Sequence, residues 1–576
     1  MTRSMSNLVD VPFWFGPRDQ SLFGILTAPG DGVVKAGVVI APPIGREAHA
    51  SRFALRALAS SLGALGIVSL RFDYHGTGDS DGNMNDSALD RRWVDDTAIA
   101  VAELRSRGVG CVSMVGERLG ATIGAVCAAR CEIELTSLVL WDPSVSGRNF
   151  LRETNALEAL RRTDVATNGD ETVKTSEFVL DADRAADLRR LSIVETGDGP
   201  LATRVLVLTR DDRVVPEKMR TRLKGPEVEW ATADEQRAML DVDPLFAVSP
   251  QRTIGRIASW LDAGSTGEFT VVDLEVRTTA EVRESAGSPL VAERLLTLGP
   301  DRLFGVLSEP HGERVGPTVV MINVSNEDHT GPSRLWVDLA RRWAGVGLAC
   351  VRFDLRGLGA SPATGGSTQK IYEPEWLANL VDVVHDVSPR DPSNVVLVGL
   401  CSGAYLAVEG AVSLGATGAC LVNPPVGVDS IRYIIHLTTS AHRPVRALGD
   451  GLKWLLLHSR GTLAIVWTFL RLLVPRRYRV DVQAEAADGG TELLVLTCEA
   501  DVSAYHGIPV LSWIERRRSL RPKGYTVHVV PELDHSMHTE AGRLRAVALI
   551  DRRIRERYVE VANRDVTRRE ARGERS

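Results

Sequence analysis

The pentapeptide Gly399-Leu400-Cys401-Ser402-Gly403 is the part of the sequence best suited to covalent chemistry. It follows the apolar run VVLV and precedes the helical pattern AYLAVEGAVSL. A nucleophile between small residues, on a tight turn from a strand into a helix, is the arrangement of enzymes that attack carbonyl groups. The helix dipole favours a thiolate at such an N-terminus. We therefore predict that Cys401 is a nucleophile, with a buried structural cysteine as the alternative; choosing Ser402 instead would put Leu400 where a small residue is needed.

An acid and a histidine follow Cys401 in the chain order that such chemistry needs. The strand pattern LLVL ends just before Glu499 and Asp501, of which Asp501 is the first choice and Glu499 the alternative. Either carboxylate taken alone could equally cap a helix. The last strand pattern is followed by His535 and His538, and His535 is the better placed of the two. The predicted catalytic set is Cys401, His535 and Asp501.

Backbone N–H groups near Cys401 would stabilise the negative oxygen that forms when a carbonyl is attacked. One predicted donor is the N–H of Ser402, directly after the nucleophile. The second comes from the turn after an early strand, where Val324 and Ser325 are the candidates. The sequence does not decide between these two.

The elements that position these residues occur twice in the chain. The tripeptide RFD at 71–73 recurs at 352–354, and LFG at 22–24 recurs at 303–305, both 281 positions later. GERLGA in the first half has its counterpart in GLCSGA, and LVLT occurs in both halves. Four anchors in the same order indicate two copies of one fold.

The first copy has lost the residues of the predicted set. The turn that corresponds to the one carrying Cys401, here called the elbow, carries Arg118 in this copy. Its guanidinium stays protonated and cannot attack a carbonyl. Asp212 remains at the acid position, but no histidine follows it until His311 in the second copy. We therefore predict that the first copy is a pseudoenzyme, in which Arg118 either pairs with Asp212 or holds an anionic ligand.

Continuous apolar strands alternate with helical patterns in both copies. This alternation predicts an α/β fold in which each copy has a mainly parallel sheet flanked by helices on both faces. Ligands bind beyond the carboxyl ends of such strands, where the predicted site residues stand. The expected organisation is a degenerate domain at 1–263, a linker at 264–268, a catalytic domain at 269–558 and a charged, disordered tail at 559–576.

Several longer motifs resemble a known family. The whole chain is similar to two α/β-hydrolase domains in tandem, of the serine-aminopeptidase-like branch, and the resemblance covers most of residues 15–558. In particular it resembles α/β hydrolases associated with exosortase and exopolysaccharide gene clusters. The first half, with APPIGREAHASR, RFDYHGTGDSDG and GERLGA, resembles the type with an arginine elbow; the second, with NVSNEDHTGPSR, RFDLRGLGAS, GLCSGA and LVNPPV, resembles the type with a cysteine elbow. The resemblance implies a hydrolase or acyltransferase without naming a substrate.

A long insertion at about 425–485 in the second copy predicts a helical lid. Between 430 and 480 it carries many arginines and a single acid, Asp450, interleaved with apolar runs that contain Trp454 and Trp467. A lid of this composition favours a substrate with an apolar part and an anionic part, such as an acyl thioester on a phosphopantetheine carrier or a lipid-linked phosphate. A helical hairpin with a solvated basic face is an equal alternative.

Composition excludes other classes of protein. With 68 Lys and Arg against 74 Asp and Glu in 576 residues, the chain has a formal net charge of −6, which argues against a nucleic-acid binder. Its seven cysteines predict a reduced, cytoplasmic protein without a disulfide framework. We find no signal peptide, no apolar run of the roughly 20 residues that a transmembrane helix needs, and neither HExxH nor paired CxxC. No metal or cofactor is therefore expected, and the oligomeric state is not determined by the sequence.

Two functions from different classes fit the pattern. The first is an enzyme that cleaves or transfers an acyl group held in an ester or thioester, and a thiol nucleophile favours thioesters or transfer. The second is a non-catalytic binding or scaffold protein that keeps only the fold. The ordered set of nucleophile, acid and histidine in one half favours the enzyme.

Overall fold

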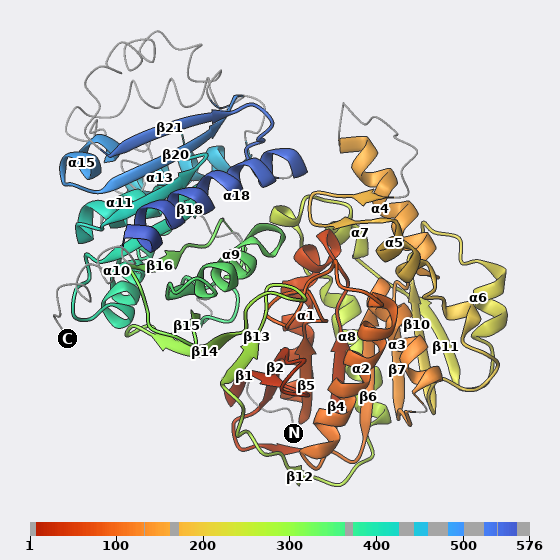
Figure 1. Ribbon diagram of the computed structural model, residues 1–576. Helices are drawn as coiled ribbons and strands as arrows, with labels where there is room; N and C mark the ends of the chain where they lie inside the picture. Colours follow the sequence, from red (N-terminus) through yellow and green to blue (C-terminus); the bar gives the residue numbers. More distant parts are fainter. Residues whose placement is uncertain are drawn as a thin grey trace. The chain divides into compact units, whose positions relative to one another are not determined.

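Short apolar runs form the strands of two large sheets in a computed structural model of the chain (Figure 1). The structure describes residues 7–561 except 132, 162–171, 326, 363–371, 426–442, 459–481, 500, 502–523 and 538. The chain divides into two units, Met1–Leu295 and Leu296–Ser576.

The first unit is built on an eight-stranded sheet. Its first two strands are antiparallel to their neighbours, and the other strands run parallel to one another. The order across the sheet is β1 (Leu8–Phe15), β2 (Leu22–Pro29), β5 (Ile67–Phe72), β4 (Ala36–Ala41), β6 (Val112–Glu117), β7 (Ser137–Trp141), β10 (Arg204–Thr209) and β11 (Val228–Thr232).

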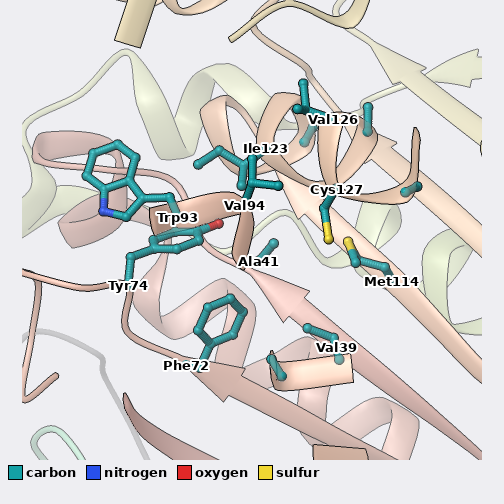
Figure 2. Packing of buried hydrophobic residues seen from close by; sticks show 14 of the residues in the cluster. Val39, Ala41, Phe72, Tyr74, Trp93, Val94, Met114, Ile123, Val126 and Cys127 are labelled. Carbon is teal, nitrogen blue, oxygen red and sulfur yellow. The ribbon is translucent and has the colours of Figure 1, made fainter. Parts of the chain in front are cut away.

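Helices cover both faces of this sheet. In α1 (Arg46–Ala64) the buried residues Ala54, Leu58 and Leu62 recur every four positions, and α1 packs with α8 (Gln251–Gly264) in one core. Helices α2 (Leu89–Ser106) and α3 (Leu119–Arg130) contribute to the core on the other face. Figure 2 shows Trp93, Val94, Ile123 and Val126 of these two helices among side chains from the strands.

The second unit repeats the strand order of the first. Its strands belong to a nine-stranded sheet, in which β13 and the first residues of β14 precede Leu296: β13 (Thr279–Val282), β14 (Val291–Leu298), β15 (Leu303–Glu309), β17 (Cys350–Phe353), β16 (Thr318–Met321), β18 (Val395–Leu400), β19 (Gly418–Val422), β20 (Glu492–Cys498) and β21 (Tyr525–Val530). From β17 to β21 all neighbours are parallel. The parallel strands therefore bring the ends of β18, β19 and β20 to one edge of the sheet.

Helices also cover both faces of the second sheet. One core contains residues of α9 (Leu335–Ala344) and α18 (Glu540–Ile554), and the other contains residues of α10 (Trp376–Val387), α11 (Ser402–Leu414) and α15 (Val482–Asp488) (Figure 1). The predicted fold class, α/β with two mainly parallel sheets flanked by helices, is confirmed.

The division between the units lies later in the chain than the joint expected at 264–268. The segment after α8 packs on the first unit: β12 (Thr270–Val271) pairs with β3 (Val33–Val34), and Trp14 pairs with Arg277. Lys35 separates β3 from β4, so the run 33–40 forms two strands rather than the single one that its apolar character suggests.

Much of the predicted lid lies outside the described residues. Within 425–485 the structure describes α13 (Arg443–His458) and the start of α15, and the predicted tail is described only to residue 561. In the described part of the chain, none of the helices combines the length and the apolar composition needed to cross a membrane. All seven cysteines are described, and none is in a disulfide.

Candidate active site

Cys401 stands on the turn between β18 and α11. Its backbone has φ 51° and ψ −114°, a conformation that residues with a side chain rarely adopt. The turn is possible because its flanking residues are glycines: a Cβ on Gly399 would lie 2.2 Å from the Gly403 carbonyl oxygen, and one on Gly403 would lie 2.6 Å from the Asn323 carbonyl oxygen. The Cys401 N–H donates to the Val422 carbonyl at 2.9 Å, which ties the elbow to β19.

The structure brings Cys401, His535 and Asp501 into one chain of contacts. His535 Nε2 lies 3.2 Å from Cys401 Sγ, and His535 Nδ1 lies 2.8 Å from Asp501 Oδ2. Because the carboxylate accepts only, Nδ1–H donates to it, which leaves Nε2 to exchange a proton with the sulfur. Three residues that are far apart in sequence thus form one hydrogen-bonded chain from sulfur to carboxylate.

The surroundings of His535 favour its charged form. Burial disfavours an imidazolium, but the hydrogen bonds to Asp501 and Cys401 outweigh it and raise the pKa of His535 from 6.5 to about 11. The side chain is nevertheless 45% exposed, so a reactant can approach it from solvent. A histidine of this kind stabilises a neighbouring thiolate at neutral pH.

The other predicted residues are placed as follows. Glu499 is exposed at the end of β20, whereas Asp501 is the carboxylate that contacts the histidine. His538 lies outside the described residues. The N–H of Ser325 donates to Ser402 Oγ at 2.7 Å, so this candidate oxyanion donor is already engaged, and Ser325 itself has a positive φ of 50°. The Ser402 hydroxyl therefore holds the turn that carries Val324 and Ser325.

Two tyrosines that the sequence analysis did not single out lie by the elbow. The rings of Tyr372 and Tyr405 meet edge to face, with centroids 5.4 Å apart. Burial raises the pKa of Tyr372 well above its usual range, and the nearby charges of Cys401 and Tyr405 add to this effect. Tyr405 is one helical turn after Cys401, a spacing that could have pointed to it; nothing in the local sequence marks Tyr372.

At the equivalent elbow of the first unit, Arg118 is buried in an ion-pair network. It has nearly the same backbone conformation as Cys401, with φ 53° and ψ −117°. Its Nε lies 2.8 Å from Glu47 Oε1, its Nη2 lies 2.6 Å from Glu153 Oε2, and its Nη1 donates to the Asp142 carbonyl at 2.9 Å. Burial disfavours the charge, but Glu47, Asp142 and Glu153 outweigh it and raise the pKa of Arg118.

The predicted pairing of Arg118 with Asp212 is wrong. Asp212 instead contacts Arg210, with Oδ2 2.8 Å from Arg210 Nη2. Arg210 lies two positions before Asp212, so Asp212 pairs within its own loop rather than with the elbow.

Glu117, the residue before Arg118, is a buried carboxyl group. Its Oε1 accepts from Ser51 at 3.0 Å and from Gln236 at 3.3 Å, while Oε2 is buried without a hydrogen-bond partner. Burial raises the pKa of Glu117 from 4.5 to about 8. The folded first unit therefore carries this group protonated at neutral pH.

We expect the Glu117 proton to make the stability of the first unit depend on pH. Between about pH 4.5 and 8 the folded state holds a proton that the unfolded state has released, so stability falls as pH rises through this window. Glu117→Gln should flatten this dependence. The stability of the variant minus that of the wild type should therefore be larger at pH 9 than at pH 5. Hydrogen exchange of β6 and β7 peptides at both pH values measures it; parallel profiles for the two proteins would contradict the assignment.

A family model matches the part of the chain that contains this site. The model is described as "Alpha/beta hydrolase family" and aligns with 319–547. Residues 319–547 match the alpha/beta hydrolase family. This segment runs from β16 into α18 and includes Cys401, Asp501 and His535, and the match supports hydrolase activity in general.

Solved structures similar to the chain include several hydrolases. Est1E from Butyrivibrio proteoclasticus, with ferulic acid bound, is 16% identical over 43% of this chain and 97% of its own, with a TM-score of 0.33. An α/β serine hydrolase without a lid from Xanthomonas campestris is 19% identical over 46% of this chain and 94% of its own, with a TM-score of 0.28. Proline iminopeptidase of Mycobacterium smegmatis is 14% identical over 45% of this chain and 99% of its own, with a TM-score of 0.31. No curated protein matches the chain at a significant level.

Proposed function

We propose that the second unit cleaves or transfers an acyl group held in an ester or thioester, with Cys401 as nucleophile. The observation that carries the proposal is the contact chain from Asp501 through His535 to Cys401 on the elbow. His535 Nε2 takes the thiol proton, the sulfur attacks the carbonyl carbon, and the same proton then goes to the leaving group. Asp501 holds the Nδ1–H and balances the imidazolium. Water or an acceptor molecule finally releases the acyl group from Cys401.

The N–H groups of Ser402 and Val324 are the proposed oxyanion donors. Ser402 begins α11, so its N–H belongs to the helix N-terminus, where backbone donors lack partners within the helix. The N–H of Ser325 is donated to Ser402 Oγ, which favours Val324 as the second donor. Stabilising the developing oxyanion is usually the largest single contribution to catalysis of acyl transfer.

The proposed substrate is an apolar acyl group on an anionic carrier. A thiol nucleophile favours thioesters and acyl transfer, and the Tyr372–Tyr405 pair offers ring surface beside Cys401. The basic and aromatic composition of 430–480 suits a carrier-bound thioester or a lipid-linked phosphate, although most of this segment lies outside the described residues. We place the reaction in the reducing cytoplasm, where thiols stay reduced.

The first unit is proposed to be a pseudoenzyme. Arg118 occupies its elbow and contacts three acidic residues, an arrangement that supports a structural role rather than a site for an anionic ligand. The proposed organisation therefore has one active unit and one inactive unit. The remaining alternative for the whole chain is a binding or scaffold protein without catalysis.

Alkylation and one serine variant test which side chain is the nucleophile. Iodoacetamide should abolish the hydrolysis of p-nitrophenyl acetate and S-phenyl thioacetate by modifying Cys401. Ser402→Ala should keep alkylation-sensitive turnover, lowered by about tenfold or less, because it loses one hydrogen bond of roughly 1 kcal/mol and not the nucleophile.

Two outcomes would contradict this assignment. Turnover that survives complete alkylation of Cys401, or that vanishes in Ser402→Ala with Cys401 intact, would move the nucleophile to Ser402. Absence of turnover and of acyl labelling with a panel of activated esters and thioesters would favour the scaffold protein.

A further inference from the structure

Asn423 follows β19 directly and uses its side-chain amide and its backbone N–H in hydrogen bonds. It is fully buried and has a positive φ of 43°. Its Nδ2 donates to the carbonyl oxygens of Asp534 at 3.0 Å and His535 at 2.9 Å. Its Oδ1 accepts from the Cys498 N–H at 2.8 Å, and its own N–H donates to Leu496 at 2.7 Å.

These bonds join the two segments that carry the partners of Cys401. Two of them hold the loop of His535 at its backbone, immediately at the residue whose ring contacts the sulfur. A third fixes the end of β20, where Cys498 Sγ in turn accepts the Asp501 N–H at 3.4 Å. We infer that Asn423 is a positioning residue that sets the distance between the His535 ring and its partners Asp501 and Cys401. This inference rests on the proposed function of the same site.

The first unit supplies a natural comparison at the same place in its fold. Asp142 follows β7 as Asn423 follows β19; its φ is 44° and its N–H donates to the Leu208 carbonyl at 2.8 Å. A carboxylate cannot donate hydrogen bonds to the carbonyls of a histidine loop. Instead, Arg118 Nη1 lies 3.5 Å from Asp142 Oδ2. The second unit thus has an amide, Asn423, at this position together with a site histidine. The first unit has a carboxylate, Asp142, at the same position together with Arg118.

This comparison selects the variants. Asn423→Asp keeps the size and tolerates the positive φ, but at neutral pH it places a carboxylate oxygen against two carbonyl oxygens. Asn423→Gly removes the side chain and also suits the left-handed backbone, so it serves as a second variant if the first does not fold. Asn379→Asp is the matched control, because Asn379 is a buried asparagine of the same unit that binds Asp301 and the Arg356 N–H rather than the site.

Asn423→Asp should lower kcat for p-nitrophenyl acetate on the order of 10²-fold with little change in KM, because the base is displaced while the substrate pocket is kept. The alkylation of Cys401 by iodoacetamide should report the same displacement. In the wild type the pKa of His535 is raised to about 11, so its ring stays protonated beside the sulfur, and alkylation should extend to lower pH than in His535→Ala. In Asn423→Asp the alkylation profile should move to higher pH, toward that of His535→Ala, whereas Asn379→Asp should keep the wild-type profile even if its unfolding temperature falls.

The outcomes separate this inference from the proposed function. If His535→Ala shifts the alkylation profile while Asn423→Asp and Asn423→Gly keep the wild-type profile and kcat, the positioning role of Asn423 is wrong and the proposed function stands. If His535→Ala itself changes neither quantity, the proposed function fails. Equal losses of kcat in Asn423→Asp and Asn379→Asp would reduce Asn423 to a structural residue and overturn the inference.

Discussion

Cys401→Ala should lower the turnover of activated esters and thioesters by at least about 10⁴-fold, because the acyl group has no covalent acceptor without the sulfur. Alanine keeps the Cβ and therefore the same backbone constraint at φ 51°, so the variant removes the sulfur without relaxing the elbow. Steady-state kinetics with p-nitrophenyl acetate measure the loss, and an unchanged unfolding temperature shows that the fold is intact.

Cys401→Ser is the matched variant for this prediction. A hydroxyl depends entirely on His535 for activation, so the serine variant should retain slow hydrolysis of activated esters and lose its sensitivity to iodoacetamide. Turnover of Cys401→Ala close to that of the wild type would show that the reaction uses another residue.

Arg118→Ala should destabilise the first unit by about 3–5 kcal/mol, since it leaves the buried Asp142 and the half-buried Glu47 without their cation. The side chain of Arg118 is only 2% exposed, and that of Asp142 is 6% exposed, so water cannot replace the lost contacts fully. Alanine also has a Cβ, so the backbone at φ 53° is equally strained in the variant and in the wild type. The loss of stability therefore measures the ion pairs. Urea unfolding followed by hydrogen exchange of first-unit peptides measures it.

The same variant tests whether the first unit takes part in catalysis. Ester turnover by the second unit should stay at the wild-type rate at temperatures where both units are folded, and Arg118→Lys, which keeps the charge, should recover part of the stability. A loss of turnover in Arg118→Ala with unchanged unfolding would contradict the pseudoenzyme proposal.

The central strands could be predicted because parallel strands are buried on both faces and read as continuous apolar runs. The runs that became β5, β7, β18 and β19 are of this kind. The recurrence of LFG and RFD 281 positions later, with two further motifs in the same order, revealed the duplicated fold. The outer antiparallel strands β1 and β14 were not predicted. Polar and apolar residues mix in them, as in VAERLLTL of β14, so their pairing depends on neighbours that local sequence does not reveal.

The positions of Cys401, Asp501 and His535 could be predicted because each follows a recognisable strand, and chain order restricts their roles. The residues that hold them in place could not. Asn423 looks like an ordinary loop residue in LVNPPV, and its importance depends on contacts with residues more than 70 positions away. The partners of Arg118 are likewise distant in sequence, which is why Asp212, the only acid considered for it, was wrong.

Mapping the acylated residue tests the central claim most directly. The intact protein is treated with an activated thioester and quenched in acid, and the mass adduct is located by peptide mass spectrometry. The account predicts one acyl group on Cys401, absent after alkylation and in Cys401→Ala, and slow to form in His535→Ala. An adduct on Ser402 or in the first unit would contradict it.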